Sequence, residues 1–411
     1  MSDGSRPGGV AISCAFEENT IRAISHAAHG HGVLVRRAVR DTAAVRRLTA
    51  SAARVLPEQE SVKSAAAKQR ARTARGALPE DVAIAPVSEF ARVVGGRFRS
   101  PLTPTFGHLI NKVLFDRQAS KVDYGDAATL IGMPGSSLRT FERNAGRRLV
   151  FHEIDAHPRV RNELLIRFFG RRSASAELIP SRMVDRIEAE LELSNHVLVP
   201  GHVVADQMTA HGVSSEKLVR VPYGVDPSVF EPRDIAPRRP GPVRVVFTGQ
   251  ITLRKGIPFL IEAVRGLPVE LTIIGQPFDR RLVADLPGNV KVAGILTPSQ
   301  LAETYADSDL FVLPTIEDCF SLVVAEAAAA GLPVVTTFEN GAYELLSSSH
   351  SVIPAGDVAA LRDLIRNAEP LTPQRRGEIA EESASRVWTT WPRYGEEVLR
   401  RLGAWGDDDV R

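Results

Sequence analysis

The sequence is poor in cysteine, almost balanced in charge and without a long apolar run. Its two cysteines, Cys14 and Cys319, form neither a disulfide framework nor a zinc-binding spacing, so a reducing compartment is expected. The formal net charge of +2 does not indicate a dedicated nucleic-acid binder. There is no stretch of about 18 apolar residues and no signal-peptide pattern. We therefore expect a cytoplasmic protein, and peripheral association with a membrane surface stays open.

What the chain does have is a repeated alternation of short apolar runs with helical patterns. Its 411 residues are enough for two domains, because single cores stop growing beyond about 250–300 residues. The alternation predicts doubly wound parallel sheets, starting with the apolar run at 10–16. A proline-rich stretch interrupts it, as a linker does. The predicted units are 10–226, a linker at 227–240, a second domain at 241–390 and a terminal segment at 391–411.

The stretch 309–346 has the pattern of a strand, a loop, a helix and another strand. Ser321 is expected to cap that helix, so the amides around 320–323 would point unpaired from its N-terminus, where phosphate groups bind. Asp318 precedes these amides and Glu326 follows them, with seven residues between the two carboxylates. This spacing would let both face one site. The alternative is a buried Ala-rich helix of another α/β protein, with Glu326 capping or solvated.

A second loop, which also lies between a predicted strand and a predicted helix, carries cations. The predicted strand 243–248 leads to Gly249, which frees the backbone to turn, and then to Arg254 and Lys255 before a helix at 257–264. Guanidinium and ammonium groups both bind phosphate. Taken alone, this stretch favours the interpretation of a surface Arg–Lys pair, but it does not stand alone.

In the first half, polar residues follow the predicted strand 148–153. Ligands bind at the carboxyl ends of strands in open α/β sheets, so His157, and after it Glu153, are candidates for contact with a substrate. The alternative gives His157 a structural role, as the cap of the predicted helix 160–169.

For two segments, contact with a membrane is one of two interpretations. The helix 160–169 has an apolar stripe, for which packing against its own domain is favoured over contact with a membrane. The segment Arg36–Arg75 has eleven Lys or Arg against three Asp or Glu, and such a surface attracts anionic lipids. The simpler interpretation of Arg36–Arg75 is a charged excursion that faces solvent.

These motifs together resemble a known family. The spacing Asp318-x7-Glu326, followed by Ala327, Gly331 and Pro333, resembles the E-x7-E segment of retaining glycosyltransferases of family 4. The usual Glu-Gly-Phe-Gly-Leu stands here as Asp-Cys-Phe-Ser-Leu. The resemblance implies the GT-B fold, in which two Rossmann-like domains face a central cleft and a C-terminal helix crosses back to the first domain.

The resemblance also implies a role for each site residue. Lys255 matches the family's diphosphate-binding cation, whereas Gln250 replaces an Arg, for which Arg254 could substitute. Glu326 would bind the ribose and Asp318 the sugar, with His157 on the acceptor side. The residues implied in donor binding are Gly249, Gln250, Arg254, Lys255, Ile295, Phe320, Ser321 and Leu322.

The implied reaction moves a sugar from a nucleotide-diphosphate donor to a glycan or lipid-linked acceptor, with retention and without a metal ion or cofactor. Family members commonly build cell-surface glycans from the cytosolic side, so an acceptor at the inner face of the plasma membrane is expected. Two alternatives remain: a GT-B epimerase or phosphorylase, which needs no separate acceptor, and a degenerate subunit that binds nucleotide without transfer. The sequence does not identify the sugar, the base, the acceptor or the oligomeric state.

Overall fold

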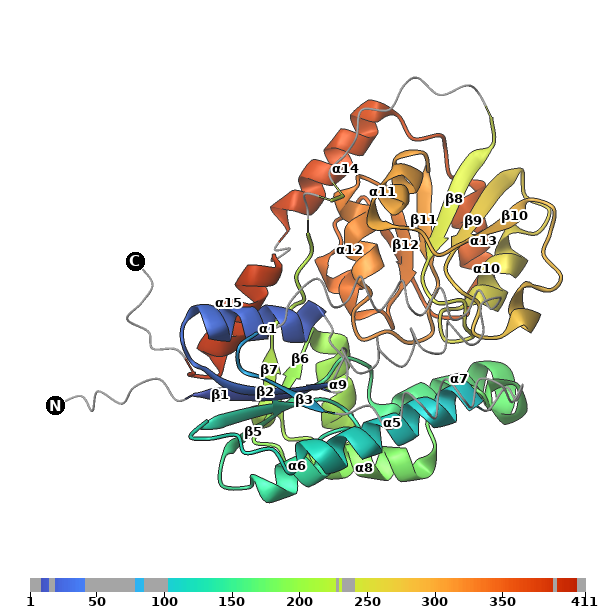
Figure 1. Cartoon of the computed structure of the whole chain (residues 1–411). Helices are drawn as coiled ribbons and strands as arrows, with labels where there is room; N and C mark the ends of the chain where they lie inside the picture. The colour runs from blue at the N-terminus through green and yellow to red at the C-terminus, as the bar shows by residue number, and fades with distance from the viewer. Residues whose placement is uncertain are drawn as a thin grey trace, which may run out of the picture.

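The computed structural model describes residues 9–14, 19–40, 78–84, 103–226, 229–230, 241–386 and 390–404. Within these ranges the chain forms two sheets flanked by helices (Figure 1). The strand orders are β3-β2-β1-β4-β5-β6-β7 and β10-β9-β8-β11-β12-β13. Each sheet therefore has a switch point, between β1 and β4 or between β8 and β11, where the order reverses. Ligands bind at such points in doubly wound sheets.

The first sheet is built from the N-terminal half of the chain, with parallel pairing throughout. Its strands are β1 (Val10–Cys14), β2 (Leu34–Arg40), β3 (Asp81–Ile84), β4 (Thr129–Gly132), β5 (Arg148–His152), β6 (His196–Val199) and β7 (Leu218–Arg220). Its helices are α1 (Asn19–Gly30), α5 (Thr103–Ala119), α6 (Leu138–Arg143), α7 (Pro158–Ala174), α8 (Ser181–Leu193) and α9 (His202–Ala210). The central strands β1 and β4 are fully buried and mostly apolar, as a sheet covered on both faces requires.

The second sheet is also parallel throughout. Its strands are β8 (Val243–Thr248), β9 (Val269–Ile274), β10 (Val290–Gly294), β11 (Leu310–Leu313), β12 (Val334–Thr337) and β13 (Ser351–Ile353). Its helices are α10 (Ile257–Val264), α11 (Pro298–Ala306), α12 (Leu322–Ala329), α13 (Val358–Arg366) and α14 (Pro373–Ser385). The GT-B-like pair of parallel sheets expected from the sequence is confirmed.

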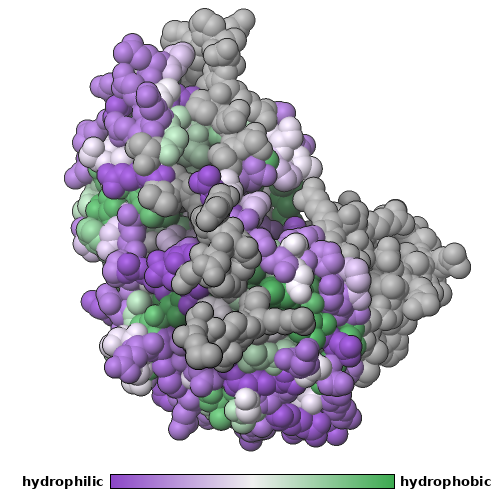
Figure 2. Space-filling model, turned by 90° about the vertical axis from the view of Figure 1, so that its left-hand side faces the viewer, coloured by the Kyte–Doolittle hydropathy of each residue, from purple (hydrophilic) through white to green (hydrophobic). Residues whose placement is uncertain are grey.

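The last helix, α15 (Trp391–Arg401), crosses back and packs against α1 (Figure 1). Its Tyr394 is buried, and the hydroxyl lies 2.9 Å from Nε2 of His152 at the end of β5. Gly395 lies so close to α1 that a Cβ atom there would be 2.3 Å from the carbonyl oxygen of Ala23. The expected return of the C-terminal helix is therefore correct. Figure 2 views this side, where hydrophilic residues predominate between smaller apolar patches.

Helix α7 forms a second link between the halves, far from α15 in Figure 1. Gly170 kinks it, with φ of 74° and ψ of 151°. Just before the kink, Phe168 and Phe169 pack on Phe259 of α10, at ring-centroid distances of 5.7 and 5.2 Å. The stripe therefore packs inside the protein, as was favoured over contact with a membrane, but apolar side chains of the second half cover it as well as those of its own domain.

Parts of the linker and of the basic segment, residues 227–228, 231–240 and 41–77, lie outside the described residues. At the start of the basic segment, Arg37 does not face solvent. It is 1% exposed and forms two hydrogen bonds with Asp81 in the neighbouring strand. In the described part of the chain, no helix has both the length and the apolar character needed to cross a membrane.

Candidate active site

The carboxyl ends of β8 and β11 bring two loops together at the switch point of the second sheet. The carbonyl oxygen of Arg254 accepts hydrogen bonds from the amide of Ile316 and the hydroxyl of Thr315, each at 2.9 Å. Gly256 follows with φ of 71°, and a Cβ atom there would lie 1.8 Å from the carbonyl oxygen of Pro314. Only glycine fits that close approach. The loops that carry the predicted cations and carboxylates are therefore held side by side.

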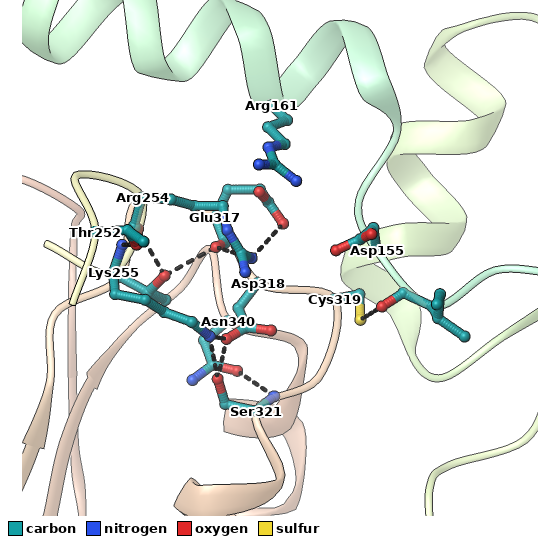
Figure 3. Close-up of polar contacts among 12 residues, drawn as sticks. Asp155, Arg161, Thr252, Arg254, Lys255, Glu317, Asp318, Cys319, Ser321 and Asn340 are labelled. Atoms are coloured by element: carbon teal, nitrogen blue, oxygen red, sulfur yellow. Dashed lines mark hydrogen bonds and ion pairs between the residues drawn. The ribbon is translucent and has the colours of Figure 1, made fainter. Parts of the chain in front are cut away.

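Lys255 and Asp318 form an ion pair between these loops (Figure 3). The ammonium group also lies 3.3 Å from the hydroxyl of Ser321, which in turn donates a hydrogen bond to Asp318. Burial by itself raises the pKa of Asp318, but the charges of Lys255 and Arg254 outweigh it and hold the pKa below its usual value. The carboxylate is therefore ionised, as the predicted role in binding a sugar requires.

A second pair, between Arg254 and Glu317, lies beside the first (Figure 3). One guanidinium nitrogen is 3.3 Å from the carbonyl oxygen of Glu317 and 3.5 Å from its carboxylate. Glu317 is 1% exposed, and burial raises its pKa although Arg254 and Arg161 oppose the effect. Sequence reasoning missed Glu317. Its only signal in the sequence was its place next to Asp318, because the burial of Arg254, which calls for a carboxylate partner, is known only from the structure.

Ser321 occupies the N-cap position of α12, as predicted, but its side chain makes no capping hydrogen bond. Its hydroxyl binds Asp318 instead, and its amide donates to Asn340 Oδ1 at 3.2 Å. The expectation that the amide of Ser321 points unpaired is therefore wrong. Phe320 is buried against the ring of Tyr223 from the first half, with centroids 5.2 Å apart. Leu322 packs on the core as well.

Glu326 lies in the second turn of α12 and is partly buried. Burial raises the pKa of its carboxyl to about 7. Among the residues that the structure describes, none forms a hydrogen bond with this side chain.

Other residues predicted to bind the donor lie in the loops after β8 and β10. The loop after β8 contains Gly249, whose φ is 152°, and Gln250, which is exposed. Ile295, after β10, is 57% exposed.

Among the described residues, His157 contacts those of the first half and not the ion pairs of the second sheet. Its Nδ1 accepts a hydrogen bond from the amide of Arg159 at 3.3 Å, so it caps α7. Its ring stacks on His211 with centroids 4.2 Å apart. Burial, and then the neighbouring His211, lowers the pKa of His157 to about 4. Within the described ranges no contact joins His157 to Asp318, and these contacts favour the capping interpretation.

The first half nevertheless reaches the site through the loop after β5. The thiol of Cys319 donates to the carbonyl oxygen of Ile154 at 2.8 Å, and Asp155 lies nearby (Figure 3). Glu153 is 1% exposed and accepts hydrogen bonds from the amides of Ile154 and Asp155, each at 3.0 Å. Burial raises the pKa of Glu153 to about 8. The described residues contain no group of three or more His, Cys, Asp or Glu arranged to hold a metal ion.

The part of the chain that forms the second sheet, with its two cation–carboxylate pairs, also matches a known family in sequence. Residues 242–368 match the family model described as glycosyl transferases group 1. This part of the chain is therefore similar in sequence to the group 1 glycosyltransferases. The matched region contains Arg254, Lys255, Asp318 and Glu326, whereas His157 lies outside it.

Two curated proteins and one solved structure show what the chain is similar to. A GDP-mannose-dependent alpha-mannosyltransferase of Mycobacterium tuberculosis is 28% identical over 217 residues, 50% of this chain and 56% of that protein. An alpha-galactosylglucosyldiacylglycerol synthase of Streptococcus pneumoniae is 24% identical over 227 residues, 47% of this chain and 59% of that protein. The chain therefore matches little more than half the length of these relatives.

The likeness in structure extends further than the likeness in sequence. Sucrose-phosphate synthase from Thermosynechococcus elongatus has a TM-score of 0.67 at 17% sequence identity, covering 97% of this chain and 99% of that chain. This likeness supports the GT-B fold of the chain across both sheets.

Proposed function

We propose that the chain is a retaining glycosyltransferase, which moves a sugar from a nucleotide-diphosphate donor to an acceptor hydroxyl. The observation that carries the proposal is the pairing of Lys255 with Asp318 beside Arg254 and Glu317. These side chains place cations and carboxylates together near the N-terminus of α12. Cations suit phosphate oxygens, and carboxylates suit the hydroxyl groups of a sugar.

The cations would stabilise the leaving group. When the bond between the sugar and the diphosphate breaks, negative charge develops on the diphosphate, and donors already in position lower the barrier. The ammonium group of Lys255 has three N–H donors, so a phosphate oxygen can join Asp318 there. At Arg254 the diphosphate would compete with Glu317.

The carboxylates would bind the rest of the donor. Asp318 would bind sugar hydroxyls and stabilise an oxocarbenium-like centre at the anomeric carbon. Glu326 would accept hydrogen bonds from the ribose hydroxyls. The exposed Ile295 would lie beside the base. Because Lys255 and Arg254 supply positive charge at the diphosphate, we expect activity to persist in EDTA.

The acceptor is proposed to be a cell-surface glycan or a glycolipid at the inner face of the plasma membrane. One relative is named a diacylglycerol glycolipid synthase, and the basic segment Arg36–Arg75 would attract anionic headgroups. Sedimentation with anionic liposomes at low and high salt tests this placement. Binding that salt does not weaken, or equal sedimentation after neutralising the arginines between 46 and 75, would contradict it.

The direct test of the proposed function is a screen of UDP- and GDP-activated sugars by thermal shift. A ligand at 100 times its dissociation constant adds about 2.7 kcal/mol of stability, so the correct donor should raise the melting temperature clearly. Nucleotide-diphosphate release is then followed with and without lipid-linked acceptors. Release that needs an acceptor supports transfer, whereas turnover without an acceptor favours an epimerase or phosphorylase. A chain that binds no nucleotide sugar contradicts the proposal.

A further inference from the structure

The loop that carries the cations is held from the opposite half of the molecule. The carboxylate of Glu177, between α7 and α8, accepts hydrogen bonds from the amides of Leu253 at 2.7 Å and Arg254 at 3.1 Å. Glu177 is 6% exposed. Its two oxygens therefore satisfy two backbone donors where little water is available.

The segment that carries Glu177 is itself anchored on the second half. Leu165 of α7 is fully buried in a cluster with Ile316, and Leu253 packs against this cluster. The carbonyl oxygen of Glu177 accepts a hydrogen bond from Arg161 at 3.3 Å. Arg161 points from α7 towards Glu317, the partner of Arg254 (Figure 3). The first half therefore contacts the backbone of the loop 249–256, called the cation loop here because it carries Arg254 and Lys255. It also places the charge of Arg161 near Glu317, the partner of Arg254 (Figure 3).

We propose that Glu177 is a positioning residue of the nucleotide-sugar site. By fixing the amides of Leu253 and Arg254, it sets the direction in which the side chains of Arg254 and Lys255 leave the backbone. Donor binding is thereby coupled to contact between the two halves. This inference rests on the proposed function, since it assigns Arg254 and Lys255 to the diphosphate.

A structural role alone would give a different result, and the chain offers a matched control. Glu344 also joins the halves through a carboxylate, which accepts a hydrogen bond from the amide of Val203 at 3.0 Å. That contact does not involve the cation loop. Loss of either carboxylate weakens the link between the halves, but only loss of Glu177 releases Leu253 and Arg254.

The experiment compares the full-length chain with Glu177→Ala, Glu177→Gln and Glu344→Gln. Calorimetry measures the affinity for UDP and GDP, hydrogen exchange follows the peptide that contains Leu253 and Arg254, and kinetics separate the donor KM from kcat. In Glu177→Gln we expect faster exchange in that peptide, with nucleotide affinity about 10-fold lower and donor KM about 10-fold higher. Glu177→Ala should lose more, because Gln keeps one acceptor oxygen. Glu344→Gln should stay within about twofold of wild type.

Unchanged nucleotide affinity in Glu177→Gln, or equal losses in Glu177→Gln and Glu344→Gln, would overturn the inference. If Glu177→Ala does not fold, Glu177→Gln decides alone, because it preserves the shape of the side chain. Failure of the proposed function is recognised separately. In that case the wild-type chain itself binds neither nucleotide nor nucleotide sugar, and the positioning role falls with it.

Discussion

At the scale of single residues, the site combines groups whose charge is set by different causes. Asp318 stays ionised because cations surround it, although it is buried. Glu326 has no such neighbours, so burial raises its pKa to about 7. The two carboxylates of the motif therefore differ in protonation near neutral pH. Only the spacing of this pair could be found from the sequence, because pKa values depend on burial and on charges brought in from other loops.

This difference predicts a pH dependence for nucleotide binding. The ionised carboxylate is the better acceptor for ribose hydroxyls. Because the pKa of Glu326 is raised, the carboxyl gains a proton as the pH falls through about 7. We expect the affinity for nucleoside diphosphates to fall several-fold between pH 8 and pH 6 in wild type, measured by calorimetry. Glu326→Gln should bind weakly at both values, and a variant that keeps the wild-type slope would show that another group titrates.

At the scale of elements, strongly patterned segments were predictable and weakly patterned ones were not. The predicted bounds of β8 and α10 agree with the structure. Helix α5 was missed, because its apolar residues do not gather on one face. The partner of the α7 stripe could not be predicted either. The periodicity shows that one face is apolar, but not which half of the molecule covers it.

Close packing of α15 on α1 predicts a large effect for a small substitution. A Cβ atom at position 395 would lie 2.3 Å from the carbonyl oxygen of Ala23, so Gly395→Ala must push the helices apart. We expect a loss of about 1–3 kcal/mol in the free energy of unfolding, measured with urea. The matched control is Gly377→Ala in α14, where a Cβ atom meets nothing within 4 Å. That change should be neutral or stabilising, by up to about 1 kcal/mol. Equal midpoints for the two variants would contradict this packing.

At the scale of the whole molecule, two parallel sheets are joined by α15 at one side and by the α7 contacts at the other (Figure 1). The fold class and the return of the last helix followed from the alternation of elements and the family resemblance. The contacts of Glu177 and Glu317 did not. Neither residue lies in a motif, and each acquires its partner only when distant loops meet.

Buried acidic groups predict that stability falls on the alkaline side. Burial raises the pKa of Glu153 to about 8, so between pH 6.5 and 8.5 the folded chain releases a proton that the unfolded chain has already lost. Stability must therefore decrease as the pH rises through this window. Buried His152 and His350, with pKa values lowered to about 3 and 4 by burial, are neutral in the folded chain there. In the unfolded chain they are half protonated near pH 6.5 and neutral above about pH 7.5, so they oppose the loss only at the lower end of the window. We expect a loss of about 1–2 kcal/mol in urea denaturation.

Glu153→Gln is the control for this loss, because the amide does not titrate. The variant should retain only the smaller slope below pH 7.5 that the raised pKa values of Glu190 and Glu326, about 7 each, produce. A wild-type stability that is constant or rises from about pH 7.5 to 8.5, where the histidines no longer titrate in either state, would show that Glu153 is not buried as a neutral acid.

The most direct test of the central claim is the binding of UDP and GDP to Lys255→Ala, measured by calorimetry beside Lys291→Ala. Lys291 is an exposed lysine of β10 in the same half of the molecule, so the control removes the same charge from outside the site. If Lys255 binds the diphosphate, Lys255→Ala should weaken binding at least about 10-fold and lower turnover by a factor of order 10²–10³, while Lys291→Ala matches wild type. Wild-type affinity and turnover in Lys255→Ala would place the diphosphate elsewhere and contradict the account.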